Sequence, residues 1–339
     1  FRNQFIFEAV GRRLVHPSGI DNIKKQFKEY FPGDADSIDR YFEKVQSVCR
    51  RTPSLNIHEN LIVPPSLEED YVSLDAVLKD LTSNGLLRGL LSSYAMCYGV
   101  KPSEISFANH SRMVLSFYES FACVKHGGDA FVRAFEEKFK EYDIEVRCGT
   151  FISEMADISD NKVGRFVLNT GDEVAADACV LTIHPKEMLK ILPEKHFSRA
   201  FISRAESFEP SVGFFSVFAM IKSGASDPYP DSGVTSLFPN EDVNLLLDPT
   251  YQGEPALVII KSPEQNDRGQ SICILEPSFT EHVSEWTASS RGKRPAEYLA
   301  YKSRKVEAIK DHIYKVFPAY RESLSIVDAG SMLTFKDYL

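Results

Sequence analysis

The stretch GGDAFVRAFEEKFKEYDIEVRCGTFISEMADISDNKVGRFVLNTGDEVAADACVLTIHP, residues 127–185, decides the fold class that we predict for this chain. After its two glycines, Phe131, Phe135 and Phe139 recur at four-residue spacing, which predicts a helix that packs one face on a sheet. The apolar run 178–183 predicts a strand that is covered on both faces. Together these features predict part of an α/β nucleotide-binding layer.

Shorter segments between that helix and the apolar run also have the character of strands. They are residues 145–147, 152–158 and 165–168, and the last two are joined by a predicted turn at Asp160 and Asn161.

The charge balance argues against a nucleic-acid partner. The 339 residues include 39 basic and 48 acidic side chains, giving a net charge of −9, and no long basic run is present. Binding to phosphates needs a concentrated positive surface. We therefore expect no nucleic-acid partner.

The cysteines and histidines do not predict a metal site. The six cysteines are scattered without C-x-x-C spacing, and the histidines share no ligand spacing with them or with carboxylates. No zinc site or disulfide framework is indicated, which favours a reducing compartment. No apolar run is long enough for a membrane-spanning helix, and the first residues lack the pattern of a signal peptide. The expected location is cytoplasmic or on a membrane surface.

The rest of the chain combines helices with a β-rich part. Residues 1–15 predict a strand or strand pair, and apolar periodicity predicts several helices from there to about residue 120. Further strands are predicted at 212–221, 235–238, 244–247, 256–261, 271–275 and 325–329, and a long helix at 296–316. We expect the strands before the long helix to form an antiparallel sheet with helices on one face, and the strand at 325–329 to return to the layer of residues 121–185.

Several motifs together resemble one enzyme family. The first motif is a succession of a glycine pair, a helix, the pattern V-x-C-x-x-x-I, a hairpin and the segment TGDEVAADACVLTIHP. The second is the segment HPSGIDNIKKQFKEYFPGDADSIDRYFEKV (16–45). The third is the stretch that begins EWTASSRGKRP and ends TFKDYL (285–339). They resemble the flavin-dependent carotenoid and retinoid oxidoreductases, which include phytoene desaturases, carotenoid isomerases and retinol saturase. Retinol saturase is the nearest of these, and the resemblance covers most of the chain.

The resemblance implies a mixed α/β fold, with a partial FAD-binding Rossmann-like domain and an inserted substrate domain of antiparallel sheet plus helices. In that division, residues 1–120 form a mostly helical substrate or lid region and 121–185 the second part of the FAD domain. Residues 186–322 form the substrate domain, and 323–339 return to the FAD domain.

The family also implies a G-x-G-x-x-G turn near the start of its FAD domain, and this sequence contains none. We therefore expect the chain to be an internal piece of a longer protein that lacks both ends of the FAD domain. The alternative is a degenerate homologue that lost its cofactor.

The resemblance places FAD beside three parts of the chain. The isoalloxazine ring is expected to lie beside the glycine pair, Gly127 and Gly128, and the adenine end of FAD beside the backbone of Ile152. The cofactor is also expected to pass beside the corner that follows the apolar run, formed by Thr182, Ile183, His184 and Pro185. Two alternatives remain open at this stage. The glycines are also typical of a plain turn into a helix, where Asp129 already satisfies the helix dipole. His184 is equally a hydrogen-bonded structural histidine.

The residues before the glycine pair differ from those of the family. Relatives carry an aromatic residue, a proline and a basic residue there, whereas this chain has Cys123, Val124, Lys125 and His126. If the family geometry is kept, His126 and Lys125 lie nearest the flavin. There they are candidate catalytic residues that protonate a reduced polyene or stabilise an anionic flavin. The alternative is a pair of solvated loop residues.

The resulting hypothesis is an FAD-dependent oxidoreductase that transfers a hydride between the flavin and a carbon–carbon bond of a hydrophobic polyene, as a desaturase, a saturase or an isomerase. One alternative is an enzyme similar to the flavin amine oxidases. Another is a flavin-free module that binds lipids. Because the family takes its substrates from membranes, peripheral membrane contact is also expected.

Overall fold

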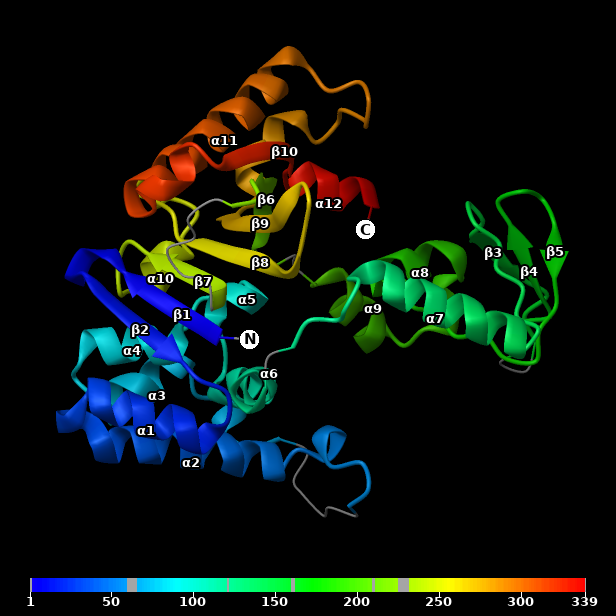
Figure 1. Ribbon diagram of the computed structural model, residues 1–339. Coiled ribbons are helices and arrows are strands. Elements are labelled where there is room, and N and C mark those ends of the chain that lie inside the picture. Colours follow the sequence, from blue (N-terminus) through cyan, green and yellow to red (C-terminus); the bar gives the residue numbers. More distant parts are fainter. Residues whose placement is uncertain are drawn as a thin grey trace. The chain divides into compact units, whose positions relative to one another are not determined.

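The computed structural model describes residues 2–59, 66–120, 122–159, 162–208, 211–224 and 232–338. It consists of two compact units (Figure 1). Unit 1 comprises Phe1–His126 and Ser211–Leu339, and unit 2 comprises Gly127–Pro210. The predicted turn at Asp160 and Asn161 lies outside the described residues.

A seven-stranded sheet is the centre of unit 1. Its strand order is β10-β6-β9-β8-β7-β1-β2, and all neighbours are antiparallel except β1 and β7, which are parallel. The strands are β1 (Arg2–Phe7), β2 (Arg12–His16), β6 (Gly213–Ile221), β7 (Ser232–Phe238), β8 (Leu257–Asn266), β9 (Gly269–Ser278) and β10 (Leu324–Gly330). The predicted sheet is thus confirmed, and the N-terminal strand pair extends it.

Side chains of both faces of this sheet are buried. Phe5 and Phe7 point to one face and join the core of the helices that precede residue 120, whereas Ile6 points to the other face. On that other face, Ile309 and Ile313 of α11 (Ala296–Val316) belong to the same core as β6 and β9. Helices on both faces therefore make this sheet the middle layer of unit 1 (Figure 1). The expectation that helices cover only one face of the sheet is wrong, because apolar side chains alternate to both faces of its strands and each face has to be covered.

Side-chain caps fix the first residues of several helices in the helical layer of unit 1. The side chains of Ser73, Asn84 and Ser106 each accept a hydrogen bond from a backbone N–H in the first turn of the helix that follows. The layer contains α1 (Ile20–Tyr30), α2 (Ala35–Arg50), α3 (Leu74–Leu81), α4 (Gly85–Ser92), α5 (Ala95–Tyr98) and α6 (Phe107–Glu119).

Unit 2 combines helices with a small antiparallel sheet in the order β3-β4-β5. Its elements are α7 (Gly128–Glu141), β3 (Ile152–Ala156), β4 (Arg165–Leu168), β5 (Glu173–Val174), α8 (Pro185–Ile191) and α9 (Arg199–Glu206). The helix after the glycine pair and the strands at 152–158 and 165–168 are confirmed.

Three predictions in unit 2 are wrong. The phenylalanine face of α7 is not packed, since the exposed fractions of Phe131 and Phe135 are 55% and 58%. Segments 145–147 and 178–183 form no strand, and Val180 is 88% exposed. A strand needs a neighbour that takes up its backbone hydrogen bonds, and none of the described strands pairs with either segment.

Two segments of unit 1 also differ from the prediction. Residues 244–247 were expected to be a strand, but α10 (Val243–Leu246) is a short helix, because the side chain of Asp242 caps it by accepting from the N–H of Asn244. The strand at 325–329 exists as β10, but it pairs with β6 in the seven-stranded sheet and not with strands of unit 2.

Candidate functional site

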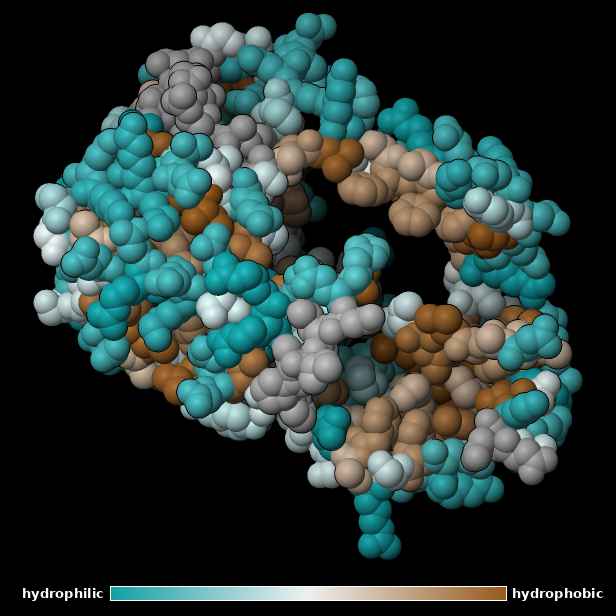
Figure 2. All heavy atoms as spheres, turned by 90° about the horizontal axis from the view of Figure 1, so that it is seen from below, coloured by the Kyte–Doolittle hydropathy of each residue, from teal (hydrophilic) through white to brown (hydrophobic). Residues whose placement is uncertain are grey.

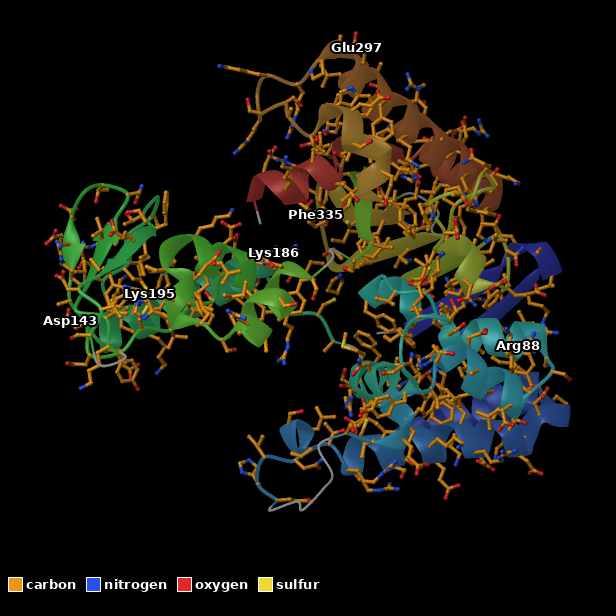
Figure 3. All side chains as sticks on the ribbon, turned by 180° about the vertical axis from the view of Figure 1, so that it is seen from behind. Arg88, Asp143, Lys186, Lys195, Glu297 and Phe335 are labelled. Carbon is orange, nitrogen blue, oxygen red and sulfur yellow. The ribbon has the colours of Figure 1, made fainter. Side chains whose placement is uncertain are left out.

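The corner at residues 182–185 is built around the N-terminus of α8. Nδ1 of His184 accepts a hydrogen bond from the backbone N–H of Lys186 at 3.2 Å, and Pro185 occupies the first turn of the helix. Lys186, labelled in Figure 3, donates from Nζ to the carbonyl of Phe208 at 2.8 Å. The Phe208 ring also packs edge-on against His184. His184 therefore has a capping role through one ring nitrogen.

The structure brings this corner close to the strand that carries Ile152. Helix α8 packs beside β3, and Ile152 is the first, half-buried residue of β3. Thr182 and Ile183 are exposed. The residues expected at the adenine end and at the corner thus lie within one small part of unit 2.

Beside Ile152, unit 2 has a cleft of about 390 Å³. Arg147 pairs with Glu145 at its rim, with 2.7 Å between Nε and Oε1, and this hydrogen bond lowers the pKa of the Glu145 carboxyl. The rest of the lining is mainly apolar: Thr150, Phe151, Ile152, Phe166, Leu168, Val174, Ala176, Ala178 and Cys179. Figure 2 shows hydrophobic side chains on the surface of unit 2. The cleft suits a partly apolar ligand.

The glycine pair is open to a ligand. Gly127 has φ 60° and ψ −145°, a conformation that side chains disfavour. A Cβ atom added at Gly127 or Gly128 would meet no described atom within 4 Å. No side chain caps α7 at Gly127 in the described part of the chain. The start of α7 thus has space for the close approach of a flat group, as a flavin ring requires, whereas Asp129 in the first turn disfavours an anion there.

Lys125 and His126 belong to unit 1, whereas the other seven predicted site residues belong to unit 2. Lys125 is exposed and has no hydrogen bond or ion pair to any described residue. The N–H of His126 donates to Oε1 of Glu264 at 2.7 Å, and its Nδ1 lies 3.6 Å from the same oxygen.

Sequence reasoning missed Glu264. It lies in β8, 138 positions away from His126, and an acidic residue near the end of a hairpin is too common to signal a site.

Unit 1 also holds a buried polar cluster that the sequence did not reveal. His110 is enclosed by two tyrosines: its Nε2 lies 2.7 Å from the hydroxyl of Tyr41, and its Nδ1 lies 2.6 Å from that of Tyr98. Tyr41 also meets the hydroxyl of Tyr118 at 2.8 Å. Burial lowers the pKa of His110 to about 3, so the imidazole stays neutral.

Neither a metal centre nor a membrane-spanning helix is found in the part of the chain that the structure describes. Among the described residues, no group of three or more histidine, cysteine, aspartate and glutamate side chains could hold a metal ion. None of the helices in the described ranges has the length and apolar character that crossing a bilayer requires.

The sequence has relatives among curated proteins. All-trans-retinol 13,14-reductase of Homo sapiens is 24% identical over 378 residues, in a match that covers 98% of this chain and 61% of the human protein. The enzyme of Macaca fascicularis is 25% identical with the same coverage, and that of Danio rerio is 22% identical and covers 100% of this chain. The chain is similar to all-trans-retinol 13,14-reductases. The predicted resemblance to flavin-dependent retinoid and carotenoid oxidoreductases is thus confirmed.

The chain spans 61% of the length of these mammalian retinol 13,14-reductases. No protein-family model matches the sequence.

Solved structures share the fold. A Pyrococcus furiosus protein superposes with a TM-score of 0.59 at 12% identity, covering 97% of this chain and 66% of its own. Cyclohexylamine oxidase of Brevibacterium oxydans superposes with a TM-score of 0.57 at 14% identity, covering 96% of this chain and 66% of its own. Likeness at this identity shows the fold alone, and it confirms the predicted mixed α/β fold class.

Proposed function

We propose that this chain belongs to an FAD-dependent oxidoreductase that acts on a carbon–carbon bond of a hydrophobic polyene of the retinoid class. The observation that carries the proposal is the similarity to retinol 13,14-reductases along 98% of the chain. The open glycine pair at the start of α7 supports it, because a flavin ring needs backbone without side chains in order to approach closely.

In this proposal FAD is held by unit 2. Gly127 and Gly128 lie beside the isoalloxazine ring, the backbone of Ile152 meets the adenine end, and residues 182–185 pass beside the cofactor. The apolar cleft next to Ile152 supports this assignment. When bound, FAD supplies the exchange of a hydride with the substrate.

The residues of the chain itself supply the proton. Saturation of a double bond adds a proton to one carbon as well as a hydride to the other, and His126 is the candidate proton donor. Nε2 of His126 has no described partner, so it is available to a substrate. Lys125 is the neighbouring candidate, either as a proton donor or as a cation that stabilises anionic flavin.

We also propose which segments of the chain bind the cofactor and which bind the substrate. Residues 121–185 form the second part of the FAD domain, whereas 1–120 and 186–322 bind the substrate. The exposed apolar side chains of Phe131, Phe135 and Val180 support the first assignment, because such surfaces in unit 2 suit packing against a further layer of an FAD domain.

An amine oxidase is the second candidate, since cyclohexylamine oxidase shares the fold. The absorption spectrum of the protein expressed from its complete gene separates the possibilities. The retinoid enzyme should show flavin bands that bleach anaerobically with a reductant and return when all-trans-retinol is added. Bleaching of the oxidised flavin by cyclohexylamine would favour the amine oxidase. A colourless protein that cannot be reconstituted with FAD would contradict both and favour the lipid-binding module.

Contact with a membrane surface is proposed for unit 1. Ile57 and Tyr71 are 77% and 80% exposed, and Leu55, close to Ile57 in sequence, is half exposed. We propose that these side chains insert into the interfacial region of a bilayer. In flotation with phosphatidylcholine vesicles, Ile57→Ser should reduce binding, whereas Val327→Ser, at another exposed position, should not. Equal flotation of both variants and the wild type would overturn the assignment.

A further inference from the structure

The backbone turns sharply where the chain leaves unit 1. His126 is the last residue of this part of unit 1, and its φ is +67°, in the left-handed region that residues other than glycine seldom adopt. Gly127 follows with φ +60°. A histidine in this conformation is strained, and the strain persists only where neighbouring groups hold it. A neighbouring group is therefore needed to hold His126 in this conformation.

That group is the carboxylate of Glu264. Its Oε1 accepts from the N–H of His126 at 2.7 Å, a short hydrogen bond to a charged acceptor. The Nδ1 atom of the same residue lies 3.6 Å from that oxygen. One carboxylate thus meets both the backbone and the ring of a single strained residue.

The hairpin that carries Glu264 is itself fixed. The N–H of Glu264 donates to Oγ of Ser262 at 3.1 Å, and beyond Glu264 the strands β8 and β9 pair through Asn266 and Gly269. Gly269 has φ +124°, and a Cβ there would lie 2.0 Å from the carbonyl oxygen of Ile221. Only glycine fits this close approach, which fixes the turn of the hairpin. Glu264 itself lies where the pairing register of β8 with β9 shifts, between Lys261 and Gln265, and it is held by the paired residues Gln265 and Asn266 that follow it.

We propose that Glu264 is a positioning residue. It locks the backbone of His126 in the left-handed conformation and so sets how the imidazole and the following glycine pair are presented. The role of His126 in proton transfer rests on the proposed function. The hold of Glu264 on the backbone of His126, which we call the lock, does not depend on that function, since it comes from the hydrogen bond between these two residues.

Hydrogen exchange at the His126 amide in the full-length protein tests the lock. In Glu264→Ala the amide should exchange about tenfold faster, because it loses a hydrogen bond to a charged acceptor. Glu264→Gln keeps an amide oxygen at the same reach without the charge, so exchange should rise only about threefold. Asp267→Ala is the matched control, since it removes an exposed carboxylate of the same hairpin that has no described partner. Wild-type exchange in Glu264→Ala would overturn the proposal.

A second comparison separates the backbone from the ring. Glycine adopts φ near +67° without strain, so His126→Gly makes the lock unnecessary. Adding Glu264→Ala should therefore accelerate exchange at the Ala130 amide, which donates to the carbonyl of Gly127 at 3.2 Å, several-fold in the histidine background and much less in the His126→Gly background. An equal effect in both backgrounds would show that Glu264 does not act through the conformation of His126.

The steady-state constants of the holoenzyme connect the lock to the reaction. Glu264→Ala should retain its flavin and its KM for the polyene while kcat falls about tenfold, because a misplaced proton donor affects the chemical step. An unchanged kcat together with faster amide exchange would overturn the catalytic part of the proposal and keep the lock. A full-length protein without flavin would overturn the proposed function, and the exchange experiment would still decide the lock.

Discussion

The hydroxyl of Tyr41 lies 2.7 Å from Nε2 of His110, at a point where neither side chain is accessible to solvent. The same hydroxyl meets that of Tyr118, so one oxygen atom joins α2 to α6 through two hydrogen bonds. Tyr41→Phe removes the oxygen and leaves two buried polar groups without this partner. We expect the free energy of unfolding to fall by about 1–3 kcal/mol in urea titrations. Tyr71→Phe is the control: it removes a hydroxyl that donates only in a solvent-exposed hydrogen bond to Oγ of Ser66, which water replaces, so it should change nothing measurable.

The buried imidazoles make stability depend on pH. Burial lowers the pKa of His16 to about 4 and that of His110 to about 3, from an unfolded value of 6.5. Below pH 6.5 the unfolded chain binds protons that the folded chain excludes, so this stability is complete above that pH and is lost as the pH falls towards 4 for His16 and towards 3 for His110. Each histidine contributes up to about 1.4 kcal/mol per pH unit in that window.

Urea unfolding of the wild type and of His110→Gln at pH 7 and pH 5 measures this contribution. The variant should lose less stability between the two pH values, because one proton-binding group is gone. Parallel losses in the two proteins would show that His110 takes up a proton while it is folded.

Gly99 and Gly11 form a matched pair for testing a close approach. Their φ angles are +65° and +61°, but a Cβ at Gly99 would lie 2.4 Å from the carbonyl oxygen of Val212, whereas one at Gly11 would meet nothing within 4 Å. Both alanine variants carry the strain of the left-handed backbone, and only Gly99→Ala adds a clash. We expect Gly99→Ala to lower the melting temperature clearly more, corresponding to about 1–3 kcal/mol beyond the effect of Gly11→Ala. Equal melting temperatures would contradict the packing of residue 99 against Val212.

Gly128 tests where the flavin approaches. It has helical backbone geometry and open space around it, so Gly128→Leu should fold normally. If the isoalloxazine ring lies against it, the leucine side chain should weaken FAD binding by the full-length protein at least about tenfold. Gly33→Leu, at another exposed glycine with open space, should bind FAD as the wild type does. The prediction fails if Gly128→Leu also retains wild-type affinity.

Patterns that depend on neighbours close in sequence were predictable. Helix α11 has the predicted bounds 296–316, because Pro295 precedes it, Pro318 follows it and its apolar spacing is regular. The strands around Phe215 and Ile259 were predicted for a similar reason, since continuous runs of β-branched and aromatic residues favour strands.

Features that depend on distant partners were not predictable. The run 178–183 has the composition of a central strand, yet Val180 is exposed because none of the described strands lies beside it to complete the pairing. Composition reports which segments favour a strand but not whether a neighbour is present. Glu264 was missed for the same reason: its contact with His126 comes from folding and leaves no local signal. Gly127 and Gly128 were singled out, and the structure places them in open space, but what binds there remains a prediction.

Strand β1 is synthesised long before β7, the strand with which it pairs in parallel. Nε2 of Gln4 donates to Oγ1 of Thr235 at 2.7 Å across 231 positions of sequence. On the ribosome, β1 therefore emerges long before the strand that covers its edge, and all of unit 2 is synthesised in between. Until β7 arrives, the nascent chain exposes an unpaired strand edge that carries Phe5 and Phe7, the kind of surface that invites misassembly. Chaperones are thus expected to bind the strand pair β1–β2 during translation.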